Sequence, residues 1–344
     1  MVNFSDSLIF WYKEHKRDLP WRHTKDPYKI WLSEIMLQQT RVEQGLPYYI
    51  KFLKLFPNVF DLASASEQQV LNAWKGLGYY SRARRLHATS KIVVNQNQGL
   101  FPETFVALNE LPGVGEYTGA AIASFCYKEV VPVVDGNVYR VLSRLFNIED
   151  PIDVGKSKKI FFDLASELID EKQPDTFNQA IMEFGALQCV PKNPNCDQCP
   201  FMEICEAFHL NKVTELPVKS RKIKRRSRYF TYLVVEKDGK YLTTQRPEKG
   251  IWANMMEFPM VETDKKVNNF EQFEQSKLND FPFEFETYST TEYRKHILTH
   301  QDIHYVFWSV KLKGNTMDQY QFIERRELNN MPFPKLLENF ISNL

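Results

Sequence analysis

The chain has 344 residues, more than a single hydrophobic core usually organises, so its length predicts two domains. Its 44 Lys and Arg nearly balance its 43 Asp and Glu, and the formal net charge of +1 excludes a strong overall electrostatic field, so any polyanionic partner must be argued from local features. No apolar stretch approaches the roughly 20 residues that cross a bilayer, and residues 1–6 lack the segments of a secretion signal, which predicts a protein of the reducing cytoplasm without membrane association.

The first half of the chain has mostly helical spacing of apolar residues, with short Pro and Gly interruptions. The clearest helical stretches are residues 5–16, 67–74, 81–95 and 156–170. This pattern predicts an all-α domain over residues 1–213.

Glu34 lies in the largely apolar segment 26–40, where Asp26 can cap and Pro27 can begin a helix. Taken alone, the segment is more often that of a solvent-facing helical Glu. If the carboxyl is instead partly desolvated, its pKa rises and it keeps its proton near neutral pH, as a general acid requires.

A turn, Leu111-Pro-Gly-Val-Gly115, separates the helical stretches 104–110 and 117–125. Gly113 and Gly115 permit positive φ and close approach, so exposed N–H groups beside a helix N-terminus can bind a phosphate without sequence specificity. A tight connection without a ligand is the alternative. The small residues of the following helix favour docking on a nucleic-acid backbone.

Asp135 follows the apolar run 131–134 and precedes Gly136-Asn137, so it is placed to cap the next helix. Capping is compatible with catalysis. One protonated and one ionised carboxyl on either side of a glycosidic bond can cleave it through an oxocarbenium-like transition state.

Four cysteines, Cys189, Cys196, Cys199 and Cys205, are separated by six, two and five residues. Thiolates select soft metals, and this spacing favours a [4Fe-4S] cluster, because structural zinc sites usually contain two Cys-x2-Cys pairs. Zinc stays the main alternative, and a disulfide framework is less compatible with the expected compartment. Cys126 is expected to be buried without a metal role.

Residues 214–228 are expected to form a linker, because seven of the ten residues from 219 to 228 are Lys or Arg. Such a segment is either a solvated tether or a phosphate contact. Strand patterns follow at 229–235, 241–245 and 304–312, with a hairpin turn at Lys237–Lys240 and a helical pattern at 333–340. Residues 229–344 therefore predict an α+β domain.

Taken in order, the turn 111–115, the segment 134–138 and the cysteine loop resemble the helix-hairpin-helix DNA glycosylase superfamily with an iron–sulfur cluster. Residues 19–22, 33–40 and 76–82 resemble specifically its adenine DNA glycosylases, which remove adenine mispaired with 8-oxoguanine. The resemblance covers nearly the whole chain. It implies a helical glycosylase domain followed by a MutT-like (Nudix-like) α+β domain.

The resemblance also implies roles for site residues. Glu34 would protonate N7 of an extruded adenine, and ionised Asp135 would stabilise positive charge on the sugar. Tyr117 stands where bifunctional relatives have a lysine nucleophile, which predicts a monofunctional enzyme, and it would orient the carboxylates together with Asn137. The adenine pocket is expected to contain Trp21, Arg22 and Gln179.

The resemblance also implies residues that contact the DNA around the lesion. Gln39 and Tyr79 occupy positions that, in the family, enter the base stack. The second domain lacks the acidic metal-binding motif of nucleotide-hydrolysing Nudix enzymes, which favours recognition over catalysis. Thr299 and His300 lie where the family contacts 8-oxoguanine, and Leu298 replaces an aromatic residue there.

The expected partner is double-stranded DNA with A:8-oxoguanine or A:G mispairs, bound by a monomer in the cytoplasm at the nucleoid. Two alternatives stay open: an endonuclease III-like glycosylase and lyase for oxidised pyrimidines, and a non-catalytic iron–sulfur DNA-binding protein. Tyr117 opposes the first, which needs the lysine, and the pair of Glu34 and Asp135 opposes the second.

Overall fold

Helix starts in the first half follow the capping residues expected from the sequence. The computed structural model describes residues 4–220, 225–267, 284–313 and 319–344. Helix α2 (Pro27–Leu37) begins after Asp26, whose side chain accepts a hydrogen bond from the Tyr28 N–H at 3.0 Å. Helix α9 (Gly136–Leu145) begins after Asp135, which accepts from two backbone N–H groups. The prediction of both caps is confirmed.

Contacts between residues divide the chain into two compact units, one of residues 1–65 and 84–222, the other of residues 66–83 and 223–344. The division expected from the sequence, at residues 213 and 229, assigned 66–83 to the helical domain. In the structure, Asn72 Nδ2 donates to the Asn330 carbonyl at 2.6 Å, and Lys75 Nζ donates to the Asn329 carbonyl at 2.9 Å. These polar contacts join residues far apart in the chain, so the local spacing of apolar residues could not reveal them.

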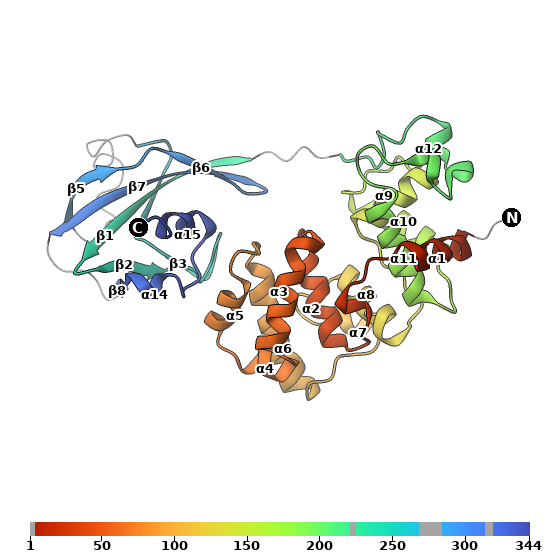
Figure 1. The fold of residues 1–344 in the computed structure, drawn as a ribbon, viewed down its shortest axis with the longest axis horizontal. Helices are drawn as coiled ribbons and strands as arrows, with labels where there is room; N and C mark the ends of the chain where they lie inside the picture. Colours follow the sequence, from red (N-terminus) through yellow and green to blue (C-terminus); the bar gives the residue numbers. More distant parts are fainter. Residues whose placement is uncertain (1–3, 221–224, 268–283, 314–318) are drawn as a thin grey trace. The chain divides into compact units, whose positions relative to one another are not determined.

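The first unit is helical, and α1, α9, α10 and α11 lie together around one apolar core that includes Trp11, Leu142, Phe161 and Phe184 (Figure 1). Helix α2 packs against α3 and α8. The other elements are η1 (Pro20–Arg22), α1 (Phe4–His15), α3 (Val42–Leu55), α4 (Val59–Ser64), α6 (Ser81–Asn97, which starts in the second unit), α7 (Phe105–Asn109), α8 (Glu116–Tyr127), α10 (Gly155–Leu168), α11 (Pro174–Leu187), η2 (Cys196–Gln198), η3 (Met202–Ile204) and α12 (Glu206–His209).

The second unit is built on a sheet with strand order β3-β2-β1-β7-β5, while β4, β6 and β8 pair with β1, β7 and β2. Its elements are α5 (Glu67–Trp74), β1 (Arg226–Lys237), β2 (Lys240–Gln245), β3 (Met256–Glu257), β4 (Met260–Thr263), β5 (Glu284–Thr290), β6 (Arg294–Ile297), β7 (Gln301–Lys313), β8 (Gln321–Glu324), α14 (Arg325–Leu328) and α15 (Lys335–Ile341). Strands β1 and β7 run parallel, with Tyr229 opposite His304.

Side chains of β1 alternate between two buried clusters, as a strand with both faces covered requires. Phe230 and Tyr232 join the cluster that α15 covers (Figure 1), whereas Leu233 and Val235 join the cluster on the other face. The predicted hairpin turn is present between β1 and β2.

Strand β1 starts three residues earlier than the sequence indicated, inside the expected linker. Arg228 forms a bidentate ion pair with Glu262, both contacts at 2.6 Å, and Arg226 lies opposite Gln301 of β7. The ion pair of Arg228 and the strand pairing of Arg226 therefore allow a basic segment to continue into the sheet. Residues 221–224 of the linker lie outside the described residues.

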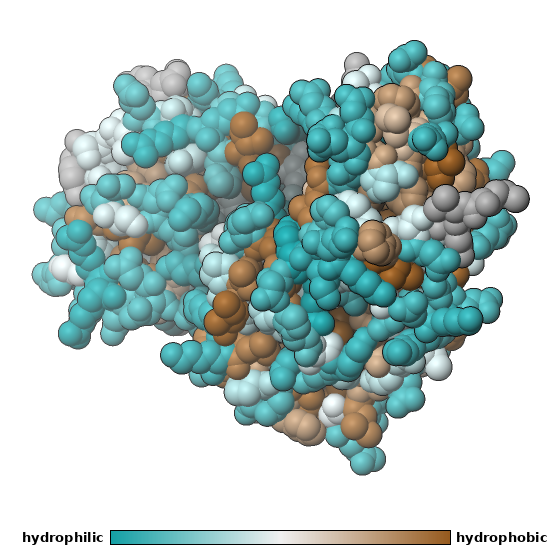
Figure 2. Space-filling view, turned by 45° about the vertical axis from the view of Figure 1, so that its right-hand side comes forward, coloured by the Kyte–Doolittle hydropathy of each residue, from teal (hydrophilic) through white to brown (hydrophobic). Residues whose placement is uncertain are grey.

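Figure 2 shows a face on which hydrophilic residues predominate and hydrophobic residues form separate patches. Exposed apolar side chains include Phe10, Leu100 and Val106. Among the described residues, no helix combines the length and apolarity needed to cross a membrane.

Candidate active site

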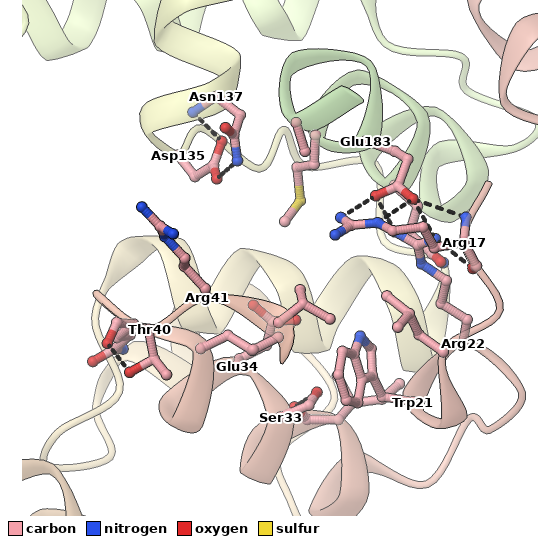
Figure 3. A pocket seen from close by; sticks show the side chains of 18 of the residues that line it. Arg17, Trp21, Arg22, Ser33, Glu34, Thr40, Arg41, Asp135, Asn137 and Glu183 are labelled. Carbon is pink, nitrogen blue, oxygen red and sulfur yellow. Dashed lines mark hydrogen bonds and ion pairs between the residues drawn. The ribbon is translucent and has the colours of Figure 1, made fainter. Parts of the chain in front are cut away.

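A cavity of about 560 Å³ opens in the first unit, between α2 and α8 on one side and the start of α9 and the middle and end of α11 on the other. This volume lies in the range of ligand pockets. Eight of the residues selected from the sequence line it: Trp21, Arg22, Glu34, Gln39, Tyr117, Asp135, Asn137 and Gln179. Figure 3 shows Asp135 and Asn137 on one side of this cavity and Glu34 on the other.

Glu34 is only 5% exposed, and its Oε2 accepts a hydrogen bond from the Tyr117 hydroxyl at 2.5 Å. Burial raises the pKa of Glu34 to about 7, with the Asp135 charge adding to the effect and the Tyr117 hydrogen bond and Arg22 opposing it. Burial and the two carboxylates also raise the pKa of Tyr117 well above its usual value, so the phenol stays a donor. Glu34 can therefore hold and deliver a proton near neutral pH.

Asp135 has a different environment from Glu34, although both line the same cavity. Burial raises its pKa, but hydrogen bonds from the N–H groups of Val138 and Asn137, the Asn137 amide and the charge of Arg140 all favour the ionised form. The three hydrogen bonds are each 2.8 Å long. A carboxylate held by so many donors is suited to stabilise positive charge.

Arg140, which the sequence did not single out, orients Asn137. Its Nη2 donates to Asn137 Oδ1 at 2.9 Å, and its Nε donates to the backbone carbonyl of Cys189 at 2.7 Å. Gly185 makes this packing possible, because a Cβ there would lie 2.7 Å from that of Asn137. The amide that holds Asp135 is thus tied to the backbone of the cysteine loop.

Glu183 is a second lining residue that was missed. It is 1% exposed and binds both Arg17 and Arg22, the latter at 2.9 and 2.6 Å. Although burial favours its protonated form, the hydrogen bonds from both arginines lower the pKa of Glu183 to about 2. The available sequence signal was a Glu within the largely apolar helical segment 177–184, which is the same kind of signal that identified Glu34. The contacts with Glu183 hold the Arg22 guanidinium at the cavity wall.

The four cysteines lie in the loop between α11 and α12, and Cys189, Cys199 and Cys205 pack against the apolar core of the first unit. None of the four forms a disulfide. Burial raises the pKa of Cys196, Cys199 and Cys205, and a charged Cys189 raises each further, so the four sulfurs influence one another.

A buried cation accompanies these thiols. Arg144 is 2% exposed, and its Nη1 lies 3.4 Å from the Cys189 sulfur. It offsets the negative charge that thiolate ligation brings. Within the described residues, no three His, Cys, Asp or Glu side chains converge as closely as the ligands of one metal ion. Four thiols within one loop are the donor set that an iron–sulfur cluster requires.

Three family models match the chain. Residues 32–167 match the HhH-GPD superfamily base excision DNA repair protein, residues 189–205 the iron–sulfur binding domain of endonuclease III, and residues 231–343 the NUDIX domain. An adenine DNA glycosylase of Buchnera aphidicola subsp. Baizongia pistaciae is 36% identical over 74% of this chain and 73% of its own length. The chain belongs to the adenine DNA glycosylase family. Its cysteine loop is the iron–sulfur binding site of that family, with a [4Fe-4S] cluster as cofactor.

Other relatives in the adenine DNA glycosylase family are longer. The Arabidopsis thaliana enzyme is 37% identical over 76% of this chain and 48% of its own length, and the human enzyme is 45% identical over 59% and 39%. The chain thus spans about half the length of these relatives, or less.

Among solved structures, a thermostable thymine-DNA glycosylase has a TM-score of 0.56 and 29% identity, covering 60% of this chain and 95% of that one. An endonuclease III bound to DNA has a TM-score of 0.53 over the same share of this chain, and its 17% identity shows a common fold alone.

The hairpin expected to contact DNA does not line the cavity. Gly113 has φ +85, and a Cβ there would lie 3.0 Å from that of Arg85, so the turn requires glycine. Gly115 has φ −95, which any residue adopts, so of the two glycines Gly113 alone uses the positive φ that glycine permits. Gly115 is instead the N-cap of α8, without a side chain that would cover the first N–H groups.

The other residues selected through the family resemblance, Tyr79, Thr299 and His300, lie in the second unit. The Tyr79 hydroxyl is 2.6 Å from Thr299 Oγ1, and Tyr79 is half exposed with a strained φ of +49. Thr299 and His300 are both exposed, in the turn between β6 and β7. A non-glycine residue in the left-handed region is an uncommon and costly conformation that clusters at functional sites. The structure thus brings Tyr79 and Thr299 together from positions far apart in the sequence.

Proposed function

We propose that the protein hydrolyses the N-glycosidic bond of adenine in duplex DNA, where adenine is mispaired with 8-oxoguanine or guanine, as a step of base excision repair. One observation carries this proposal: Glu34 and Asp135 line a single cavity, Glu34 with a pKa that burial raises to about 7, and Asp135 with three hydrogen-bond donors and Arg140 opposing the rise in pKa that burial causes. Membership in the adenine DNA glycosylase family supports the same reaction.

The reaction begins when adenine rotates out of the duplex into the cavity, since its glycosidic bond is inaccessible inside the stack. Glu34 donates its proton to N7. The bond between C1′ and the base then breaks, and its electron pair leaves with the neutral adenine. Trp21, Arg22 and Gln179 line the same cavity and are proposed to hold the base.

Asp135 stabilises the positive charge that develops on the deoxyribose. Asn137 keeps its carboxylate in place through the side-chain hydrogen bond. Water adds to C1′ and gives up a proton to the Glu34 carboxylate, which restores the acid and leaves an abasic site. No imine forms at Tyr117, because a phenol cannot make one. The enzyme is therefore monofunctional.

The [4Fe-4S] cluster takes no part in these steps. Held by the four cysteines, it would tie the end of α11 to α12 and fix the Cys189 carbonyl that Arg140 binds. Because all residues assigned to the chemistry come from one unit of one chain, we also propose that a monomer is active.

A strand-cleavage assay tests the proposed reaction. Duplexes carrying A opposite 8-oxoguanine, A opposite G, and thymine glycol are incubated with the protein and divided into samples with and without alkali. Breaks that appear only after alkali, and only with the two adenine mispairs, are expected. Breaks without alkali at thymine glycol would instead show the endonuclease III-like activity, and no base release from any duplex would show a non-catalytic protein.

Discrimination of 8-oxoguanine from guanine is assigned to Thr299 and His300, which are exposed and lie beside Tyr79. Replacing both by Ala should lower the ratio of single-turnover rates for the two mispairs about tenfold, the effect of losing one or two hydrogen bonds. Thr290→Ala, another exposed Thr of this sheet, is the matched control. A ratio that stays the same in the double variant would remove these residues from lesion recognition.

A further inference from the structure

Five cationic side chains line the cavity, and four of them are held by the protein itself. Arg17 and Arg22 bind Glu183, and Lys25 Nζ binds Asp175 and the Phe125 carbonyl at 2.6 and 2.9 Å. Arg140 donates to Asn137 and to the carbonyls of Gly136, Gly185 and Cys189. The N–H groups of these four cations are therefore already hydrogen-bonded to the protein.

Arg41, the fifth cation, differs from the other four in its contacts. It is exposed at the N-cap of α3, and within the described part of the chain its side chain makes neither a hydrogen bond nor an ion pair. Its neighbour Glu43 also lines the cavity, but it forms no ion pair with Arg41 among the described residues. Figure 3 shows the Arg41 side chain extending from the loop after α2 toward the side of the cavity where Asp135 lies.

We infer that Arg41 binds a phosphate next to the extruded nucleotide. This inference rests on the proposed function. If Glu34 and Asp135 act on one glycosidic bond, the deoxyribose lies between them and its two phosphates lie at the cavity mouth. The ionised Asp135 repels those phosphates, and a guanidinium at the rim without a partner among the described residues offsets the repulsion and can bind phosphate through two N–H groups.

The first test compares Arg41→Gln, Arg41→Lys and the wild-type protein. For binding to a duplex with a stable abasic-site analogue, Arg41→Gln should reduce the slope of log K against log salt by about 0.9, the value for one phosphate contact. Its single-turnover adenine release should fall about ten- to a hundredfold. Arg41→Lys should keep the salt slope, because it keeps the charge. Arg325→Gln, an exposed arginine that does not line the cavity, should change neither measurement.

A second test identifies the ligand group. A neutral methylphosphonate replaces, in turn, each phosphate flanking the target deoxyadenosine. At one of the two positions, Arg41→Gln should cause no further loss beyond that of the methylphosphonate itself. If the losses add at both positions, or if Arg41→Gln leaves the salt slope unchanged, Arg41 is not a phosphate ligand. Failure of the proposed function is distinguishable, because wild-type protein would then release no adenine while the binding slopes still test Arg41.

Discussion

Glu34→Gln should bind an A:8-oxoguanine duplex as tightly as the wild-type protein while releasing adenine at least about a hundredfold more slowly. General acid catalysis typically contributes 10²–10⁴ in rate, and the amide has no proton to donate at a useful pKa. The Gln carbonyl oxygen can still accept the hydrogen bond from Tyr117. Because burial already disfavours an ionised group at this position, the neutral amide should not lower the melting temperature. Single-turnover release and a binding titration measure the two effects separately.

Glu43→Gln is the matched control for this variant, because Glu43 lines the same cavity but is exposed. It should release adenine at close to the wild-type rate. Normal turnover of Glu34→Gln would remove Glu34 from the role of acid. Loss of binding together with turnover would show that the change disturbed the cavity.

Asp135→Asn should also abolish most of the activity, by about a hundred- to a thousandfold, for a different reason. The variant keeps an oxygen that accepts the N–H groups of Asn137 and Val138, so the cap of α9 survives. It loses the negative charge that lowers the energy of the oxocarbenium-like transition state. The rate of adenine release should therefore fall while the melting temperature changes little.

Asp26→Asn makes the same chemical change at another helix cap, outside the cavity lining. It should leave the rate of release unchanged. If both substitutions slow the reaction equally, or if Asp135→Asn retains wild-type activity, the charge of Asp135 has no catalytic role.

Much of the fold followed from local patterns. The caps at Asp26 and Asp135, the hairpin before β2 and the change from helical to strand periodicity after the linker depend on residues close together in the chain, and the structure contains each of them. The two carboxyl groups were also identifiable, because Glu34 is an acid inside a largely apolar helical segment, which is unusual, and Asp135 directly follows an apolar run at a helix start.

What the sequence did not show depends on contacts between distant residues. Arg140 and Glu183 matter because of the groups they bind, Asn137 and Arg22, and neither pairing has a local pattern. The association of residues 66–83 with the second unit is of the same kind. The conformations of Gly113 and Gly115 were also left open by the sequence, since two glycines in one turn do not reveal which of them takes the left-handed conformation.

The most direct test of opposite protonation at Glu34 and Asp135 is the pH dependence of single-turnover adenine release from an A:8-oxoguanine duplex. Above about pH 7 the rate should fall about tenfold per pH unit, because Glu34 loses the proton it must donate. Tyr117→Phe removes the hydrogen bond that lowers the Glu34 pKa, so the midpoint should move to higher pH. A rate that stays constant from pH 7 to pH 9, or a midpoint that Tyr117→Phe leaves in place, would contradict a protonated Glu34 as the acid.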